Sequence, residues 1–124
     1  MSLLHNKAQK IKLIVFDIDN VLTDGRIIWS SDFTETKNFN VVDGFGLKLA
    51  QSVGLKIGVI SARKSIVSEK RIEELKFDAI SIGEKNKLNS IEKFKINCNI
   101  EYSEIAYMGD DLLDLSVLRI CGLS

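Results

Sequence analysis

The sequence lacks the features on which several large classes of protein depend. It has no proline and only two cysteines, Cys98 and Cys121, which stand far apart with no CxxC or Cys/His spacing around them. A disulfide scaffold or a zinc site is therefore not expected, and a reducing, cytoplasmic location is predicted. The first residues are too polar for a signal peptide. No apolar run approaches the roughly 20 residues of a membrane span, so no membrane association is expected.

An excess of charge of either sign is also missing. Lysine plus arginine and aspartate plus glutamate each number 17, so the formal net charge is +0. No bulk charge is available to attract nucleic acid or an anionic membrane. Any anion must therefore be bound by a local arrangement of side chains. The length of 124 residues predicts one domain, residues 1–124.

The chain does contain a regular alternation of short apolar runs and amphipathic segments. The short β-branched runs suit buried strands, and the longer amphipathic segments suit helices. This alternation predicts an α/β fold with a parallel sheet covered on both faces. Strands are predicted at residues 12–17, 55–61, 77–83 and 104–109, helices at 43–54, 65–76, 85–96 and 110–120, and a hairpin formed by 26–31 and 35–40.

Polar side chains gather where the predicted strands end. Ligands of parallel α/β sheets bind beyond the carboxyl ends of the strands, so these side chains are candidates for a site. Two strands end in carboxylates, and the other two lead to a hydroxyl or to cations. In chain order they are Asp17 and Asp19, Ser61 and Arg63, Lys87, and finally Asp110, Asp111 and Asp114.

This collection of groups favours one kind of chemistry. Carboxylates gathered at one edge repel each other unless a cation joins them, and an all-oxygen cluster favours Mg²⁺. A hydroxyl and an ammonium nearby suit a phosphate dianion. A strand-end carboxylate such as Asp17 can act as a nucleophile. A second carboxylate two residues later, Asp19, faces the same side of an extended chain and can move a proton. The residues therefore predict metal-assisted phosphoryl transfer.

Four motifs carry a family resemblance: "DIDNVLT", "VISAR", "GEKNK" and "GDDLLD". In this order and spacing they resemble the haloacid dehalogenase-like hydrolase superfamily. With "DGRIIWSS" and "KNFNVVDGFGLKL", the chain from about Ile11 onward resembles the capless 3-deoxy-D-manno-octulosonate 8-phosphate phosphatase-like family. The resemblance implies a three-layer Rossmann-like sheet with a β-hairpin flap and no cap domain. It also implies a Mg²⁺-dependent phosphatase of lipopolysaccharide biosynthesis that assembles as a homotetramer.

The same resemblance assigns roles to individual residues. Asp17 becomes the nucleophile and a Mg²⁺ ligand. Asp19 becomes the general acid and base, a substrate contact, and a metal ligand through its backbone carbonyl. Asp110 is the third protein ligand, and Ser61 and Lys87 hold the phosphoryl group. The other positions are Asp111 and Asp114, which orient Lys87 and the metal's waters, and the substrate contacts Asn40, Asp43, Gly44, Lys48, Arg63 and Arg71.

Several positions depart from the family pattern. Asn20 and Ala62 stand where the resemblance expects glycine, and Val42 replaces a basic residue. Asparagine is the residue after glycine that best tolerates a left-handed turn, so the turn at Asn20 is expected to survive. The chain stops at "CGLS", so we expect it to lack the family's C-terminal strand, helix and tail.

Two other functions fit parts of the pattern. Bacterial receiver domains also place carboxylates, a hydroxyl and a lysine around Mg²⁺, but their phosphoacceptor ends the third strand, which here ends in "SIG". The second alternative is a non-catalytic or weakly active assembly domain, related to the C-terminal domain of acylneuraminate cytidylyltransferases. Trp29 and Phe39 are open to two interpretations, as hairpin packing or as an oligomer contact.

Overall fold

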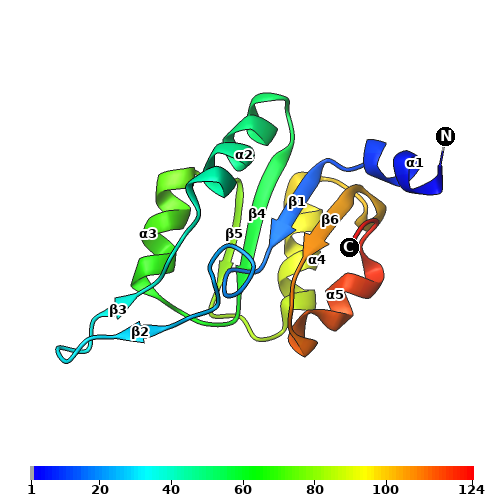
Figure 1. The fold of residues 1–124 in the computed structure, drawn as a ribbon. Helices are drawn as coiled ribbons and strands as arrows, with labels where there is room; N and C mark the ends of the chain where they lie inside the picture. The colour runs from blue at the N-terminus through cyan, green and yellow to red at the C-terminus, as the bar shows by residue number, and fades with distance from the viewer. Residues whose placement is uncertain (1) are drawn as a thin grey trace.

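A four-stranded parallel sheet forms the centre of the computed structural model, which describes residues 2–124. Its strand order is β5-β4-β1-β6, and every neighbouring pair is parallel (Figure 1). The predicted α/β fold is confirmed, with each strand slightly shorter than expected. The bounds are β1 Leu13–Phe16, β4 Lys56–Ser61, β5 Ala79–Ile82 and β6 Ile105–Met108.

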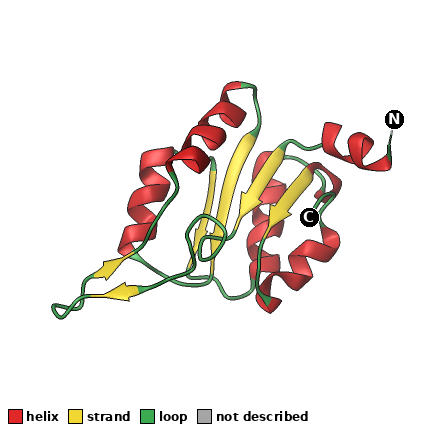
Figure 2. Ribbon diagram, in the orientation of Figure 1, coloured by secondary structure: helices red, strands yellow, loops and turns green. Residues whose placement is uncertain are grey.

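Helices cover both faces of this sheet, as Figures 1 and 2 show. Helices α2 (Val41–Ser52) and α3 (Ile66–Leu75) lie on one face. Helices α4 (Lys87–Cys98) and α5 (Leu115–Ile120) lie on the other. Within residues 2–124 no helix has the length and the apolar character needed to cross a membrane.

The alternation of side chains along the strands explains these layers. On β1, Leu13 and Val15 are fully buried in the core under α4 and α5. On β4, Ile57 and Val59 are buried in the other core, under α2 and α3. Successive residues of a strand point to opposite faces, so a continuous apolar run fills two cores at once. The site at the strand ends therefore rests on a rigid, doubly packed sheet.

The predicted hairpin is present and projects away from the sheet (Figure 1). It consists of β2 (Ile28–Trp29) and β3 (Glu35–Thr36), paired antiparallel with Trp29 opposite Glu35. Large apolar side chains on it face solvent, since Trp29 is 60% and Phe33 86% exposed. The hairpin returns directly to α2, so its second strand passes close to the carboxyl edge of the sheet.

Some predicted boundaries differ from the structure for local reasons. Helix α2 begins at Val41 rather than Asp43 because the Asn40 side chain accepts a hydrogen bond from the Val42 amide (2.8 Å). The helix predicted at 110–120 starts instead as a 3-10 turn, η2 (Leu112–Asp114), capped by Asp111. A second 3-10 turn, η1, spans Tyr102–Glu104. A short helix that was not predicted, α1 (Leu3–Gln9), precedes the first strand.

The apolar residues that predicted α2 lie on its outer face. Phe45 is 69% and Leu49 56% exposed, and Val53 is also exposed. The face turned toward the sheet carries Gly44 and Leu47 instead. Both faces of this helix are apolar in part, so a four-residue spacing predicted the helix but not which face it buries.

Candidate active site

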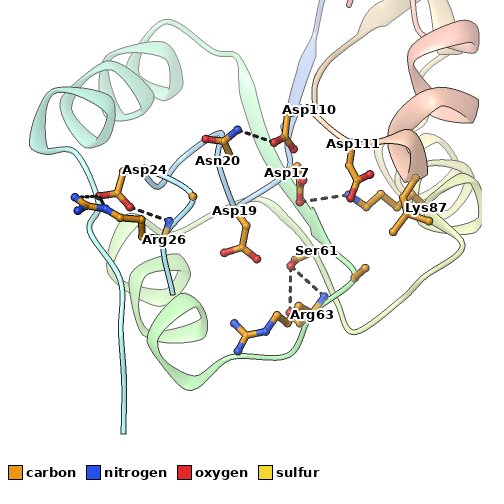
Figure 3. Close-up of a pocket in the computed structure, with 13 residues that line it drawn as sticks. Asp17, Asp19, Asn20, Asp24, Arg26, Ser61, Arg63, Lys87, Asp110 and Asp111 are labelled. Carbon is orange, nitrogen blue, oxygen red and sulfur yellow. Dashed lines mark hydrogen bonds and ion pairs between the residues drawn. The ribbon is translucent and has the colours of Figure 1, made fainter. Parts of the chain in front are cut away.

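The residues that follow three of the strands, together with the first residue of α4, line one pocket at the carboxyl edge of the sheet (Figure 3). Its volume is about 680 Å³, and polar side chains from distant parts of the sequence turn into it. The pocket therefore lies at the carboxyl ends of the strands, where a site was predicted. Seven of the predicted site residues line it: Asp17, Asp19, Ser61, Arg63, Lys87, Asp110 and Asp111.

Asp17 is the most deeply placed carboxylate of the pocket. Its backbone amide donates to the Met108 carbonyl (3.0 Å), which continues the β1–β6 pairing one residue beyond the strand. Its Oδ1 accepts from the Ile18 amide (2.8 Å) and lies 3.3 Å from Lys87 Nζ. Burial raises the pKa of Asp17, and the Asp114 charge raises it further, although Lys87 and the Ile18 amide oppose both. A cation bound in the pocket would stabilise the charged form of Asp17.

Lys87, the first residue of α4, is held by a buried polar network. Its Nζ donates to Asp114 Oδ1 (2.6 Å), and the Tyr107 hydroxyl donates to the same oxygen (2.5 Å). The amide of Asp111 donates to Asp114 Oδ2 (3.0 Å). Burial by itself would raise the pKa of Asp114, but these hydrogen bonds together hold it below its usual range. Burial, and then the bond to Asp114, raises the pKa of Tyr107. Asp114 thus directs the ammonium of Lys87 toward Asp17.

Asp111, which was expected to orient Lys87 as well, has a different contact. Its Oδ1 accepts from the Leu112 amide (2.6 Å) and caps the η2 turn, although the residue also lines the pocket. The preceding Gly109 has no room for a side chain, because a Cβ there would lie 2.4 Å from Asp114 Cγ. The "GDDLLD" sequence therefore builds a compact turn that seats Asp114 beneath the pocket.

Three carboxylates of this network could hold a metal ion. One oxygen each from Asp17, Asp110 and Asp114 lies within 4.8 Å of the others. An all-oxygen set at this spacing fits a hard divalent cation such as Mg²⁺. Asp114 is already engaged by Lys87 and Tyr107, so Asp17 and Asp110 are the side chains best placed as ligands. The Asp19 side chain is not in this group, and the ligand role of its backbone carbonyl stays a prediction.

Asn20 adopts the left-handed backbone conformation that the sequence predicted, with φ at 63°. Its side chain does more than tolerate the turn, since Asn20 Nδ2 donates to Asp110 Oδ2 (2.8 Å; Figure 3). The Asn20 amide in turn donates to Thr23 Oγ1 (3.1 Å). The residue that departs from the family pattern therefore orients a candidate metal ligand.

Ser61 and Arg63 form the opposite wall of the pocket. The Ser61 hydroxyl donates to the Arg63 carbonyl (3.1 Å) and accepts from the Arg63 amide (3.3 Å), which shapes the loop after β4. The Arg63 guanidinium is ion-paired with Glu35 of the hairpin and lies 5.9 Å over the Trp29 ring. The hairpin thus supports a cation that faces the pocket.

Two charged residues of the hairpin strand were missed by the sequence analysis. Lys37 Nζ donates to Asp19 Oδ1 (2.7 Å), and Glu35 holds Arg63. Burial by itself would raise the pKa of Glu35, but hydrogen bonds from Arg63 and Ser65, together with the Lys37 charge, hold it below its usual range. Residues two apart on an extended strand share a face. Opposite charges at 35 and 37 were therefore a signal that this face meets charged partners.

Five predicted substrate contacts do not line the pocket. Two of them link α2 and α3: Arg71 Nη2 donates to the Asn40 carbonyl (3.4 Å), and Lys48 Nζ donates to the Leu75 carbonyl (2.6 Å). A Cβ on Gly44 would lie 2.6 Å from Arg71 Nη2, so glycine there makes room for the guanidinium. Their role in substrate binding stays a prediction for Asn40, Asp43, Gly44, Lys48 and Arg71.

Known proteins are similar to this chain in sequence and in fold. No family model matches the chain. The 3-deoxy-D-manno-octulosonate 8-phosphate phosphatase KdsC of Escherichia coli K12 is 36% identical over 118 residues, which are 95% of this chain and 63% of that protein. The chain thus spans a little under two thirds of the length of such curated relatives.

Solved structures are similar as well. The 3-deoxy-D-manno-octulosonate 8-phosphate phosphatase of Moraxella catarrhalis, in complex with a magnesium ion, a phosphate ion and KDO, superposes with a TM-score of 0.93 at 39% identity. That match covers 98% of this chain and 70% of the other. A HAD superfamily (subfamily III A) hydrolase of Legionella pneumophila gives a TM-score of 0.92 at 34% identity, over 94% of this chain and 64% of the other.

Fold, motif order and site geometry together define a domain of the haloacid dehalogenase-like superfamily. Within that superfamily the chain belongs to the 3-deoxy-D-manno-octulosonate 8-phosphate phosphatase (KdsC) family.

Proposed function

We propose that the protein is a Mg²⁺-dependent phosphatase that hydrolyses a phosphomonoester of an acidic sugar. The candidate substrates are 3-deoxy-D-manno-octulosonate 8-phosphate and related nonulosonate 9-phosphates. One observation carries the proposal: two carboxylates, a hydroxyl and a buried lysine converge on one pocket, and Asp110 belongs to a carboxylate group there that could hold a metal ion. Metal-assisted phosphoryl transfer through a covalent intermediate can use each of these groups.

In the first step, Asp17 is the nucleophile. A carboxylate oxygen of Asp17 forms a bond to phosphorus while the bond from phosphorus to the sugar oxygen breaks. Asp19 gives a proton to the departing sugar oxygen. Lys87 and Ser61 bind the oxygens of the transferring phosphoryl group, whose charge needs fixed donors in a water-poor site. The product of this step is an aspartyl-phosphate on Asp17 and a free sugar.

The second step restores the enzyme. Asp19, now a carboxylate, takes a proton from a water molecule as that water attacks phosphorus. The bond between phosphorus and Asp17 breaks, and inorganic phosphate leaves. Mg²⁺, held by Asp17, Asp110 and the Asp19 carbonyl, would supply electrostatic stabilisation of the phosphoryl oxygens. The Moraxella structure, which contains magnesium and phosphate, supports the choice of metal.

An acidic sugar suits the cations on the pocket wall. Arg63 and Arg26 line the pocket without being part of the phosphate-binding set. An arginine side chain binds a carboxylate with two parallel hydrogen bonds, so Arg63 is a candidate partner for the carboxylate of the sugar. The Moraxella structure contains KDO, an acidic sugar, which agrees with this choice of substrate class.

Phosphate release from a panel of phosphorylated acidic sugars tests the proposal. With Mg²⁺ present, we expect turnover of at least one panel member, and loss of turnover when EDTA removes the metal. Neutral sugar phosphates of the same size serve as controls and should react more slowly, because they lack the carboxylate for Arg63. A folded protein that releases no phosphate from any panel member contradicts the proposal.

Asn20→Gly should weaken Mg²⁺ binding by about 10-fold, the lower end of the effect that outer partners of metal ligands have. Glycine keeps the left-handed turn but removes the hydrogen bond that orients Asp110. Titration calorimetry with Mg²⁺ measures the change. The matched control is Asn38→Gly, because Asn38 also donates to an aspartate, Asp24, that is not a candidate ligand. Equal affinities for Asn20→Gly and the unaltered protein would show that Asp110 needs no such support.

We also propose that the protein assembles as a homotetramer in the cytoplasm. Apolar side chains exposed on the hairpin and on α2, among them Trp29, Phe33 and Phe45, support an association between copies of the chain. The free cysteines fit a reducing compartment.

The exposed apolar side chains of the hairpin and α2 are also the observation that favours the alternative of an assembly domain. The alternative predicts the same oligomer without phosphate release, so the substrate panel separates the two.

A further inference from the structure

Lys37 carries a positive charge in a place where an unpaired charge would be costly. Its side chain is only 1% exposed, although the residue follows a hairpin strand that otherwise lies at the surface. Burying an ammonium group is unfavourable unless it is paired and hydrogen-bonded. The partners of Lys37 therefore show what the charge is for.

Three partners surround the ammonium. Lys37 Nζ donates to Asp19 Oδ1 (2.7 Å) and to Ser68 Oγ of α3 (3.1 Å), and Glu35 Oε1 lies 3.9 Å away. Ser68 is itself almost fully buried. Ser68 and Glu35 hold the ammonium from the side of the protein, so its strongest contact is directed at Asp19.

Of these three partners, only Asp19 lines the pocket at the carboxyl edge of the sheet. Within residues 2–124, the only hydrogen bond to the Asp19 side chain comes from Lys37 and reaches Oδ1. The Oδ2 oxygen of Asp19 has no protein donor there. Figure 3 shows the Asp19 carboxylate turned into the pocket that Ser61 also lines. One oxygen is thus anchored by Lys37 and the other is left for the substrate.

We propose that Lys37 is a positioning residue for Asp19, which it holds in the orientation needed to pass a proton to the leaving sugar oxygen. The proposal rests on the phosphatase function proposed above. A carboxylate on a short side chain has several rotamers, and proton transfer needs the oxygen within hydrogen-bond reach of its target. An ion pair between one oxygen and a buried ammonium favours the rotamer that keeps this contact.

The leaving group distinguishes this role from simple structural support. A sugar alkoxide is a strong base and leaves with a proton from Asp19, whereas p-nitrophenolate is a weak base and leaves without one. For both esters, kcat/KM reports the step in which Asp17 is phosphorylated. If Lys37 positions Asp19, its loss must slow the sugar ester far more than the aryl ester. General distortion of the pocket would slow both alike.

The experiment compares Lys37→Met with the unaltered protein on p-nitrophenyl phosphate and on the sugar phosphate that gives turnover. We expect kcat/KM for the sugar phosphate to fall by roughly 100-fold, at the lower end of what general acid catalysis contributes, with little change in KM. The value for p-nitrophenyl phosphate should fall by less than about 10-fold, since no proton is needed there. Lys37→Arg should recover part of the loss on the sugar phosphate. Equal losses on both esters would overturn the proposal.

Two further variants complete the test. Lys70→Met on α3, where the lysine is 81% exposed, is the matched control and should change neither value. Ser68→Ala removes the support behind Lys37 and should cause a smaller loss in the same direction, which provides a test if Lys37→Met does not fold. Absence of turnover by the unaltered protein on both esters would refute the phosphatase function instead. A crystal structure of Lys37→Met or Ser68→Ala then decides whether Lys37 positions Asp19, because an unmoved Asp19 side chain overturns this role.

Discussion

Asp17→Asn is expected to abolish phosphate release and, in the absence of metal, to raise the melting temperature. An amide cannot form the aspartyl-phosphate, so turnover should fall by roughly a thousand-fold or more, as in enzymes that lose a covalent nucleophile. The rise in stability has a separate cause. Burial and the nearby Asp114 charge raise the pKa of Asp17, which means that the folded protein disfavours the charged form.

The sign of the stability change follows from proton linkage. A carboxyl group with a raised pKa contributes its stability at low pH and loses it as the pH rises through that pKa. At neutral pH, Asp17 is therefore a net cost to the folded protein, and an uncharged asparagine removes this cost. Asparagine keeps an oxygen for the Ile18 amide, and Lys87 keeps Asp114 as its partner. Stabilising changes of this kind are commonly worth about 0.5–2 kcal/mol.

Thermal unfolding in EDTA at several pH values measures this effect. The advantage of Asp17→Asn should grow as the pH rises from acid to neutral, and it should shrink when Mg²⁺ is added, because a bound cation offsets the repulsion. Asp24→Asn is the matched control of opposite sign. Hydrogen bonds from Asn38 and Arg26 lower the pKa of Asp24 to about 2, so its charged form is favoured and asparagine should not stabilise. A lower melting temperature for Asp17→Asn in EDTA would contradict the argument.

Lys87→Met is expected to destabilise the protein by about 3–5 kcal/mol, the cost of leaving a buried charge without its partner. Lys87 Nζ is the common partner of Asp17 (3.3 Å) and Asp114 (2.6 Å), and both carboxylates are buried. Domains of this kind have a total stability of about 5–15 kcal/mol, so the loss is a large part of it. Turnover should disappear as well, because Lys87 is assigned to the phosphoryl group. Urea unfolding monitored by circular dichroism measures the stability.

A double variant separates the two roles of Lys87. Lys87→Met leaves Asp17 and Asp114 without their lysine partner. Adding Asp114→Asn removes one of these two unpaired charges and should recover part of the stability without restoring turnover. The double-mutant cycle then gives the coupling between Lys87 and Asp114. Lys93→Met, at an exposed position of the same helix, is the control and should change stability by less than about 0.5 kcal/mol. If Lys87→Met is as stable as this control, the buried network has been misread.

Most of the fold could be predicted because the information is local. Continuous apolar runs such as residues 13–16 pack into both cores, and alternation with amphipathic segments leaves a parallel sheet as the natural arrangement. The position of the pocket followed from the same reasoning, since carboxyl ends of parallel strands meet at one edge. The left-handed turn at Asn20 was predicted from the family resemblance, which expects glycine there, and from the tolerance of asparagine for this conformation.

The remainder depended on contacts between distant segments. Tyr107 looked like an ordinary strand residue until its hydroxyl was found on Asp114, and Lys37 looked like a hairpin lysine until its ammonium was found on Asp19. Phe45 and Leu49 predicted a helix correctly, but their exposure depends on how α2 is rotated against the sheet. The spacing of apolar residues along the chain does not show how the helix is rotated against the sheet.

The sequence alone thus determined the elements, the parallel sheet, and the kinds of side chain at its carboxyl edge, because periodicity and strand-end position are properties of neighbouring residues. Only the tertiary structure decided the partners of those side chains. It places Asn20 on Asp110, Lys37 on Asp19, and Arg71 between α2 and α3 rather than in the pocket. Such pairings depend on distances of a few ångströms between segments far apart in the chain, which packing sets and local sequence does not encode.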